Sequence, residues 1–136
     1  MAAIMRVVNH SILLPADPHK VYAMYLDPAA HAAFTGGGDV TIAPRVGAEF
    51  SAFGGRISGR IISLIPDRQI VQTWRSFEWH ADDPDSILLL TLRPESGGTR
   101  LELLQAPAPE HLHATLQANW PMRYLDPWRA ALTVKA

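Results

Sequence analysis

The feature that most constrains the fold of this 136-residue chain is a series of short β-strand patterns separated by two tight turns. Gly54-Gly55 forms the first turn, because glycine adopts the positive φ angles of such turns without steric cost. A β-branched run from Ile57 to Ile65 follows, and Pro66-Asp67-Arg68 forms the second turn. Residues 70–75 then return as another strand. The pattern predicts an antiparallel meander.

The sequence on either side of this meander predicts helices and further strands. Asp17-Pro18 and Asp27-Pro28 each begin a short helix, because aspartate accepts hydrogen bonds from first-turn amides and proline suits the first helical position. Asn119-Trp120-Pro121 has the same pattern, and Pro127 should bend the terminal helix or loosen one of its turns. Further strands are expected at residues 6–14, 40–43, 49–53, 86–93 and 99–105, and a shorter helix at 110–118.

Composition excludes several classes of protein. The formal charge of −1 argues against a nucleic-acid partner, and the absence of cysteine excludes disulfides, zinc–thiolate sites and a cysteine nucleophile. No apolar run approaches the roughly 20 residues that span a bilayer, and the N-terminus does not resemble a signal peptide. We therefore expect one cytoplasmic domain over residues 1–136, with no membrane partner.

Motifs for catalysis or metal binding are weak. The chain has six histidines, but His111 and His113 would point in different directions on a helix, and no HExxH pair occurs. No G-x-S-x-G elbow is present, and Gly36-Gly37-Gly38 lacks the lysine of a phosphate loop. The acidic and aromatic loop at 77–85 suggests a cation site, but its spacing matches no calcium loop, so a solvated loop is favoured. We expect no catalytic residue, no metal and no cofactor.

A ligand site is the better hypothesis. Ile70, Gln72 and Trp74 alternate onto one face of their strand. Trp120 and Tyr124 share a helix face, four residues apart. With Phe53 they would form an apolar cavity with a few polar groups, as small-molecule sites usually have, although plain core packing is the alternative reading. The predicted ligand-binding residues are Phe53, Ile70, Gln72, Trp74, Trp120 and Tyr124. Glu102 should face solvent, because Leu101 and Leu103 occupy the inner face of the strand.

Several short motifs follow one another in a characteristic order and spacing from about Val8 to Leu132. They are Phe34-Thr35, Val46-Gly47, Phe53-Gly54-Gly55, Ile57-Ser58-Gly59, Leu64-Ile65-Pro66, Ile70-Val71, Trp74-Arg75, Gly97-Gly98-Thr99 and, near the end, Trp120, Tyr124 and Leu125. With the element order, they make the chain resemble the START-like (SRPBCC) helix-grip superfamily. The resemblance is closest to the C-terminal domain of the heat-shock protein 90 ATPase activator and its single-domain relatives. Two residues depart from this pattern: many relatives have tryptophan at the position of Phe34 and glycine at the position of Asn119.

The resemblance implies an α+β helix-grip fold. A curved antiparallel sheet wraps around a long C-terminal helix, and two short helices follow the first strand. It further implies that a hydrophobic or aromatic small molecule binds in a cavity between sheet and helix. The alternatives are a protein-interaction module that contacts a chaperone and, less favoured, a cavity enzyme of the cyclase or hydratase type. The apolar run at residues 87–90 also suggests a strand covered on both faces, by a helix or by a second subunit in a homodimer.

Overall fold

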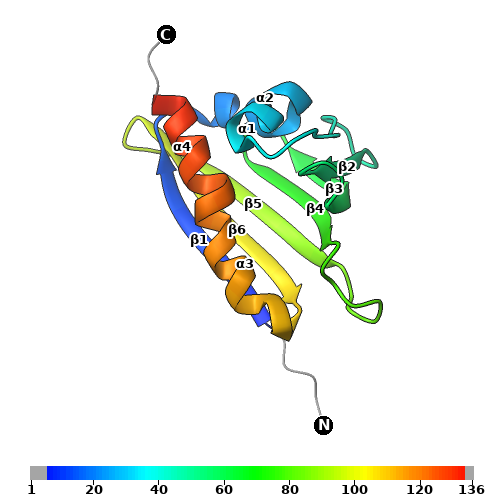
Figure 1. The fold of residues 1–136 in the computed structure, drawn as a ribbon. Coiled ribbons are helices and arrows are strands. Elements are labelled where there is room, and N and C mark those ends of the chain that lie inside the picture. Colours follow the sequence, from blue (N-terminus) through cyan, green and yellow to red (C-terminus); the bar gives the residue numbers. More distant parts are fainter. Residues whose placement is uncertain (1–5, 134–136) are drawn as a thin grey trace.

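A computed structural model describes residues 6–133 and shows a curved antiparallel sheet that grips a long C-terminal helix (Figure 1). The six strands are ordered β1-β6-β5-β4-β3-β2, which confirms the predicted helix-grip α+β fold. The elements are β1 (Arg6–Leu14), α1 (Pro18–Leu26), α2 (Pro28–Thr35), β2 (Glu49–Ala52), β3 (Ile57–Ile65), β4 (Gln69–Ser76), β5 (Ser86–Glu95), β6 (Gly98–Ala108), η1 (Glu110–Leu112), α3 (His113–Trp120), η2 (Pro121–Leu125) and α4 (Asp126–Thr133). Within residues 6–133, no helix combines the length and the apolar character needed to cross a bilayer.

The predicted meander forms one half of the sheet. Strands β2, β3 and β4 pair antiparallel in sequence order. Gly54 and Gly55 have φ angles of 66° and 93° in the first turn, and Asp67 has a φ of 63° in the second. The local turn chemistry therefore fixed this part of the sheet, as expected from the sequence.

The two short helices after β1 begin where the aspartate–proline pairs predicted. The Asp17 carboxylate accepts a hydrogen bond from the Lys20 amide at 2.9 Å, and the Asp27 carboxylate accepts one from the Ala29 amide at 3.0 Å. Gly36 ends α2 in the left-handed conformation, with a φ of 64°. These caps satisfy amide and carbonyl groups that the short helices leave free.

The predicted strand at residues 40–43 is wrong. Only Thr41 pairs there, through two backbone hydrogen bonds of 2.9 Å with Ser51 at the edge of the sheet. The Gly36–Gly38 run precedes this segment, and Pro44, which has no amide hydrogen, follows it. This leaves too few consecutive residues for a ladder.

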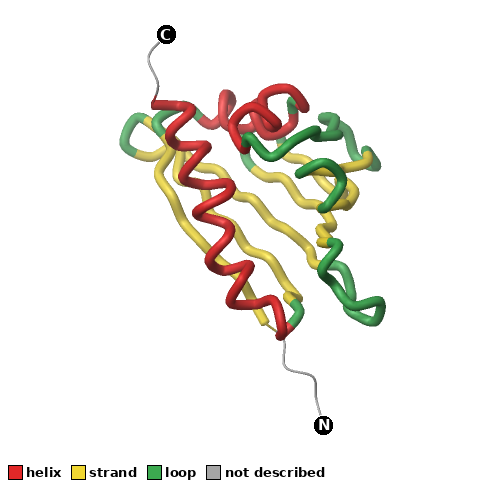
Figure 2. Tube along the Cα trace, viewed as in Figure 1, coloured by secondary structure: helices red, strands yellow, loops and turns green. Residues whose placement is uncertain are grey.

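The predicted helix start at Asn119 is also wrong. The helical segments from η1 to α4 follow one another without a break, and Asn119 lies inside α3 (Figure 2). The helix accommodates Pro121 and Pro127 by widening η2 into a π-turn, in which the Asp126 amide donates to the Pro121 carbonyl. A continuous helix keeps Trp120, Tyr124 and Trp128 buried on one face, and this burial outweighs the local signal for a new helix start at Asn119. The loosened turn expected next to Pro127 is confirmed.

The helices lie on one face of the sheet, so the two faces of β5 differ (Figure 1). Leu88 and Leu90 point inward and are buried, whereas Ile87 remains 41% exposed on the outer face. Leu104 on the neighbouring strand β6 is also 41% exposed. The expected second cover of β5 is therefore not supplied by a helix of residues 6–133, and cover by a partner subunit stays a prediction.

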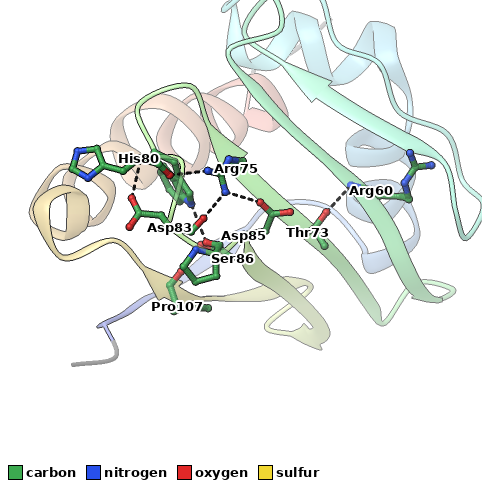
Figure 3. A network of polar contacts seen from close by, with 10 residues as sticks. Arg60, Thr73, Arg75, His80, Asp83, Asp85, Ser86 and Pro107 are labelled. Carbon is green, nitrogen blue, oxygen red and sulfur yellow. Dashed lines mark hydrogen bonds and ion pairs between the residues drawn. The ribbon is translucent and has the colours of Figure 1, made fainter. Parts of the chain in front are cut away.

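We predict that Gly59→Ala destabilises the fold. A Cβ at this position would overlap the backbone carbonyl of Thr73. The two strands approach closely here, and the Thr73 hydroxyl accepts a hydrogen bond from the Arg60 amide at 2.9 Å (Figure 3). The free energy of unfolding should fall by about 1–3 kcal/mol, measured by urea denaturation. Ser58→Ala, at an exposed neighbouring position, should change it by less than about 0.5 kcal/mol. Equal urea midpoints for the two variants would contradict the steric argument.

Candidate functional site

A cavity of about 430 Å³ lies between the sheet and the C-terminal helix. Strands β3 and β4 and the turn after β2 form one wall, and helical residues from Leu112 to Tyr124 form the other. Its apolar lining consists of Phe53, Ile57, Trp74, Phe77, Leu112, Leu116, Trp120 and Tyr124. The volume and the apolar lining fall within the usual range for small-molecule sites.

The aromatic lining residues form a continuous wall. The ring centroids of Trp74 and Trp120 are 5.6 Å apart, those of Trp120 and Tyr124 are 4.7 Å apart, and those of Tyr124 and Phe53 are 5.5 Å apart. The indole nitrogen of Trp120 donates to Oε1 of the buried Gln105 at 2.8 Å, which fixes the ring against β6. Such aromatic pairs add stability beyond their buried area, so the wall is a rigid surface.

The structure brings together four of the six residues predicted to bind a ligand. Phe53, Trp74, Trp120 and Tyr124 all line the cavity. Ile70 and Gln72 share the buried face of β4 with Trp74, as predicted, but do not belong to the lining. Gln72 instead accepts a hydrogen bond from the Tyr25 hydroxyl at 2.5 Å and donates to the Thr73 carbonyl at 3.2 Å.

A buried histidine stands behind the cavity wall. Nδ1 of His31 lies 2.8 Å from the Tyr25 carbonyl oxygen, which can only accept, so Nδ1 carries the proton. The bare Nε2 therefore accepts from the Tyr124 hydroxyl at 3.2 Å. In the sequence His31 is one of six histidines and belongs to no recognised motif. The available signal was its position three residues before Phe34 on a short, otherwise apolar helix, where both side chains share the buried face.

Burial makes this hydrogen-bonded pair neutral at physiological pH. Loss of water around the imidazolium lowers the pKa of His31 to about 4, and the hydrogen bond to the Tyr25 carbonyl offsets this only in part. Burial also raises the pKa of Tyr124. The wall behind the cavity therefore presents an uncharged hydroxyl and carbon, and no ionised base or nucleophile.

Charged and polar groups are concentrated at the rim of the cavity. They are Arg56, Glu78, Thr115, Asn119 and Arg123, whereas Ser76 is a buried polar residue of the lining. Within residues 6–133, the guanidinium groups of Arg56 and Arg123 form no ion pair, and both side chains are exposed. An apolar interior with unpaired cations at its opening suits a molecule with an apolar body and an anionic end.

Comparison with known proteins supports this architecture. The model of the family described as "Activator of Hsp90 ATPase homolog 1-like protein" matches residues 15–132. The "Activator of 90 kDa heat shock protein ATPase homolog" of Dictyostelium discoideum is 28% identical over 110 residues, which are 81% of this chain and 28% of that protein. The chain spans 28% to 35% of the length of the curated relatives it matches.

Two solved structures share the fold at low sequence identity. An HSP90 activator from Plasmodium falciparum superimposes with a TM-score of 0.85 at 18% identity, covering 93% of this chain and 96% of the other. The Aha1 dimer from Colwellia psychrerythraea gives a TM-score of 0.77 at 20% identity, covering 96% of this chain and 98% of the other. At these identities the likeness concerns the fold alone.

We predict that His31 makes the fold less stable as the pH falls from 6.5 to about 4. The unfolded chain binds a proton at His31 below pH 6.5, whereas the folded protein resists protonation until about pH 4. The resulting loss should approach about 3 kcal/mol at the acid end of this window. Urea unfolding across the window should show this loss in the unaltered chain but not in His31→Asn. His19→Asn, which removes an exposed histidine, should keep the dependence, and a His31→Asn profile parallel to that of the unaltered chain would contradict the prediction.

Proposed function

The chain belongs to the Activator of Hsp90 ATPase homolog 1-like protein family, and we propose that it uses the cavity between its sheet and its C-terminal helix to bind an amphipathic small molecule. One observation carries this proposal. The aromatic cavity of about 430 Å³ has two exposed arginines in its lining, Arg56 and Arg123, and neither has an ion-pair partner within residues 6–133. The ligand class we propose is an aromatic or aliphatic body with a carboxylate, sulfonate or similar anionic group.

The neutral wall decides how such a ligand would be oriented. Tyr124 and His31 are both uncharged and bonded to each other, so an anion at the inner end of the cavity would lose its water without gaining a cation. Arg56 and Arg123 offer charge-assisted hydrogen bonds at the rim instead. The apolar body therefore enters first, along Trp74 and Trp120, and the anionic group stays at the opening.

We predict that 8-anilinonaphthalene-1-sulfonate, an aromatic sulfonate, binds at this site and gains fluorescence. The double variant Arg56→Gln/Arg123→Gln should weaken its binding at least about fivefold, because it removes both donors to the sulfonate. Arg45→Gln/Arg68→Gln is the matched control, since it removes the same charge from exposed positions outside the lining. Equal weakening by both pairs would contradict a role for the rim arginines.

A variant with a larger side chain in the cavity tests whether the probe binds there. Thr115 is an exposed lining residue, so Thr115→Trp should occupy part of the space without disturbing the core. Binding of the same probe should then be lost, while circular dichroism stays unchanged. Undiminished binding would place the probe elsewhere and contradict the cavity proposal.

A second candidate function is contact with a heat-shock protein 90 chaperone. The name of the Dictyostelium discoideum relative and the family description both favour it. The exposed outer face of the sheet, with Ile87 and Leu104, would be the contact surface, because exposed apolar side chains grouped on adjacent strands suit a protein interface.

We predict that immobilised chain retains purified heat-shock protein 90 at micromolar concentration. Ile87→Ser/Leu104→Ser should lose retention, because it removes the apolar outer face. Phe77→Ser/Met122→Ser is the control, since these exposed apolar residues lie on the loop after β4 and on η2. Failure of the unaltered chain to retain the chaperone would contradict this second function, and equal retention by both variants would contradict the proposed face.

A further inference from the structure

Two histidines from distant parts of the chain meet beside the cavity. His80 lies in the loop between β4 and β5, and His111 lies in η1 at the start of the C-terminal helix. Their ring centroids are 3.9 Å apart and their planes differ by 8°. Their spacing in the sequence does not predict this pairing, because the fold brings the two residues together.

A carboxylate completes the cluster. The side-chain ligand atoms of His80, Asp83 and His111 all lie within 4.8 Å of one another. One oxygen of Asp83, Oδ2, accepts from the His80 amide at 2.8 Å, which holds the carboxylate next to the imidazole. The other oxygen, Oδ1, accepts no hydrogen bond from any of the residues 6–133.

The loop that carries two of these residues is held in shape by Arg75. Its guanidinium donates to the backbone carbonyls of His80 at 2.8 Å and of Asp83 at 2.6 Å, and it pairs with Asp85 at 2.9 Å (Figure 3). The Trp79 indole also donates to the Pro84 carbonyl at 3.2 Å. A loop backbone fixed in this way loses less conformational freedom when an ion binds to its side chains.

We propose that His80, Asp83 and His111 bind one divalent ion of the borderline class, such as Zn²⁺, Ni²⁺ or Co²⁺. Imidazole nitrogens and a carboxylate oxygen suit these ions, whereas Mg²⁺ and Ca²⁺ prefer ligand sets made of oxygen. Three protein ligands leave at least one coordination position for water. Metal–nitrogen bonds of about 2.0–2.1 Å require the two stacked rings to turn toward a common point, which their solvent exposure permits.

The charge around the cluster favours a cation. Glu78, Asp82 and Asp85 lie in the same loop region as Asp83, and Arg75 is already paired with Asp85. A bound ion would join the β4–β5 loop to the start of the C-terminal helix. The loop supplies Phe77 and Glu78 to the cavity rim, and the helix supplies Leu112, so the ion would fix two sides of the opening relative to each other.

The test is isothermal titration of ZnCl₂ into chelator-treated protein that carries no histidine tag. We expect one ion per chain with micromolar affinity, and a rise in melting temperature with Zn²⁺ concentration. His111→Ala and Asp83→Asn should each weaken binding at least about tenfold. The control is His113→Ala, because this neighbouring histidine is engaged with the Val7 carbonyl at 2.8 Å and lies outside the cluster.

A second readout identifies the ligands directly. Co²⁺ in place of Zn²⁺ should give visible absorption bands that disappear in His80→Ala/His111→Ala, a variant whose altered residues are exposed and whose fold circular dichroism can verify. The proposal is overturned if Zn²⁺ fails to bind at submillimolar concentration. It is equally overturned if binding survives in the double variant or falls just as far in His113→Ala.

Discussion

The packing of one helix face against the sheet and α2 holds the rest of this structure in place. Trp128 stacks on Phe34 with ring centroids 4.7 Å apart, and four residues earlier Tyr124 donates a hydrogen bond to His31. At the other end of the face, Trp120 contacts Trp74 of β4. The upper part of the helix thus closes the core against α2. The N-terminal part, α3, is tied to β1 by polar contacts such as those of Gln117 with His10 and Asn9. It faces β3 and β4 across the aromatic wall, where the cavity lies.

This arrangement explains which parts of the fold were predictable. Turns at Gly54-Gly55 and helix caps at Asp17 and Asp27 depend on residues within a few positions, so the sequence alone identified them. The continuous helix through Asn119 was missed because burial of Trp120 and Tyr124 against distant strands overrides a local signal for a new helix start. The same limit applied to the site. Trp74, Trp120 and Tyr124 followed from strand and helix periodicity, but the partner of His31 lies 93 positions away.

The buried polar groups restrict what the cavity can hold. Tyr25, Gln72, His31 and Tyr124 satisfy one another by hydrogen bonds, so they add rigidity without adding charge. Within this network no group is left free to stabilise an ion at the inner end. The cations that can pair with a charged ligand group are at the rim, where Arg56 and Arg123 are exposed and a surface salt bridge is worth little unless water is partly excluded.

The rim is also where the two binding proposals meet physically. Arg75 already holds the β4–β5 loop in shape through the His80 and Asp83 carbonyls, so an ion at His80 and His111 would add little to the folding of the loop itself. Its effect would be to fix the distance between the loop and η1, and hence between Phe77 and Leu112, which both line the cavity. If that distance differs between the empty and the ligand-bound protein, the ion and the ligand must change each other's affinity by the same factor, because binding linkage is reciprocal. If it does not differ, the two sites are neighbours in space but independent in free energy.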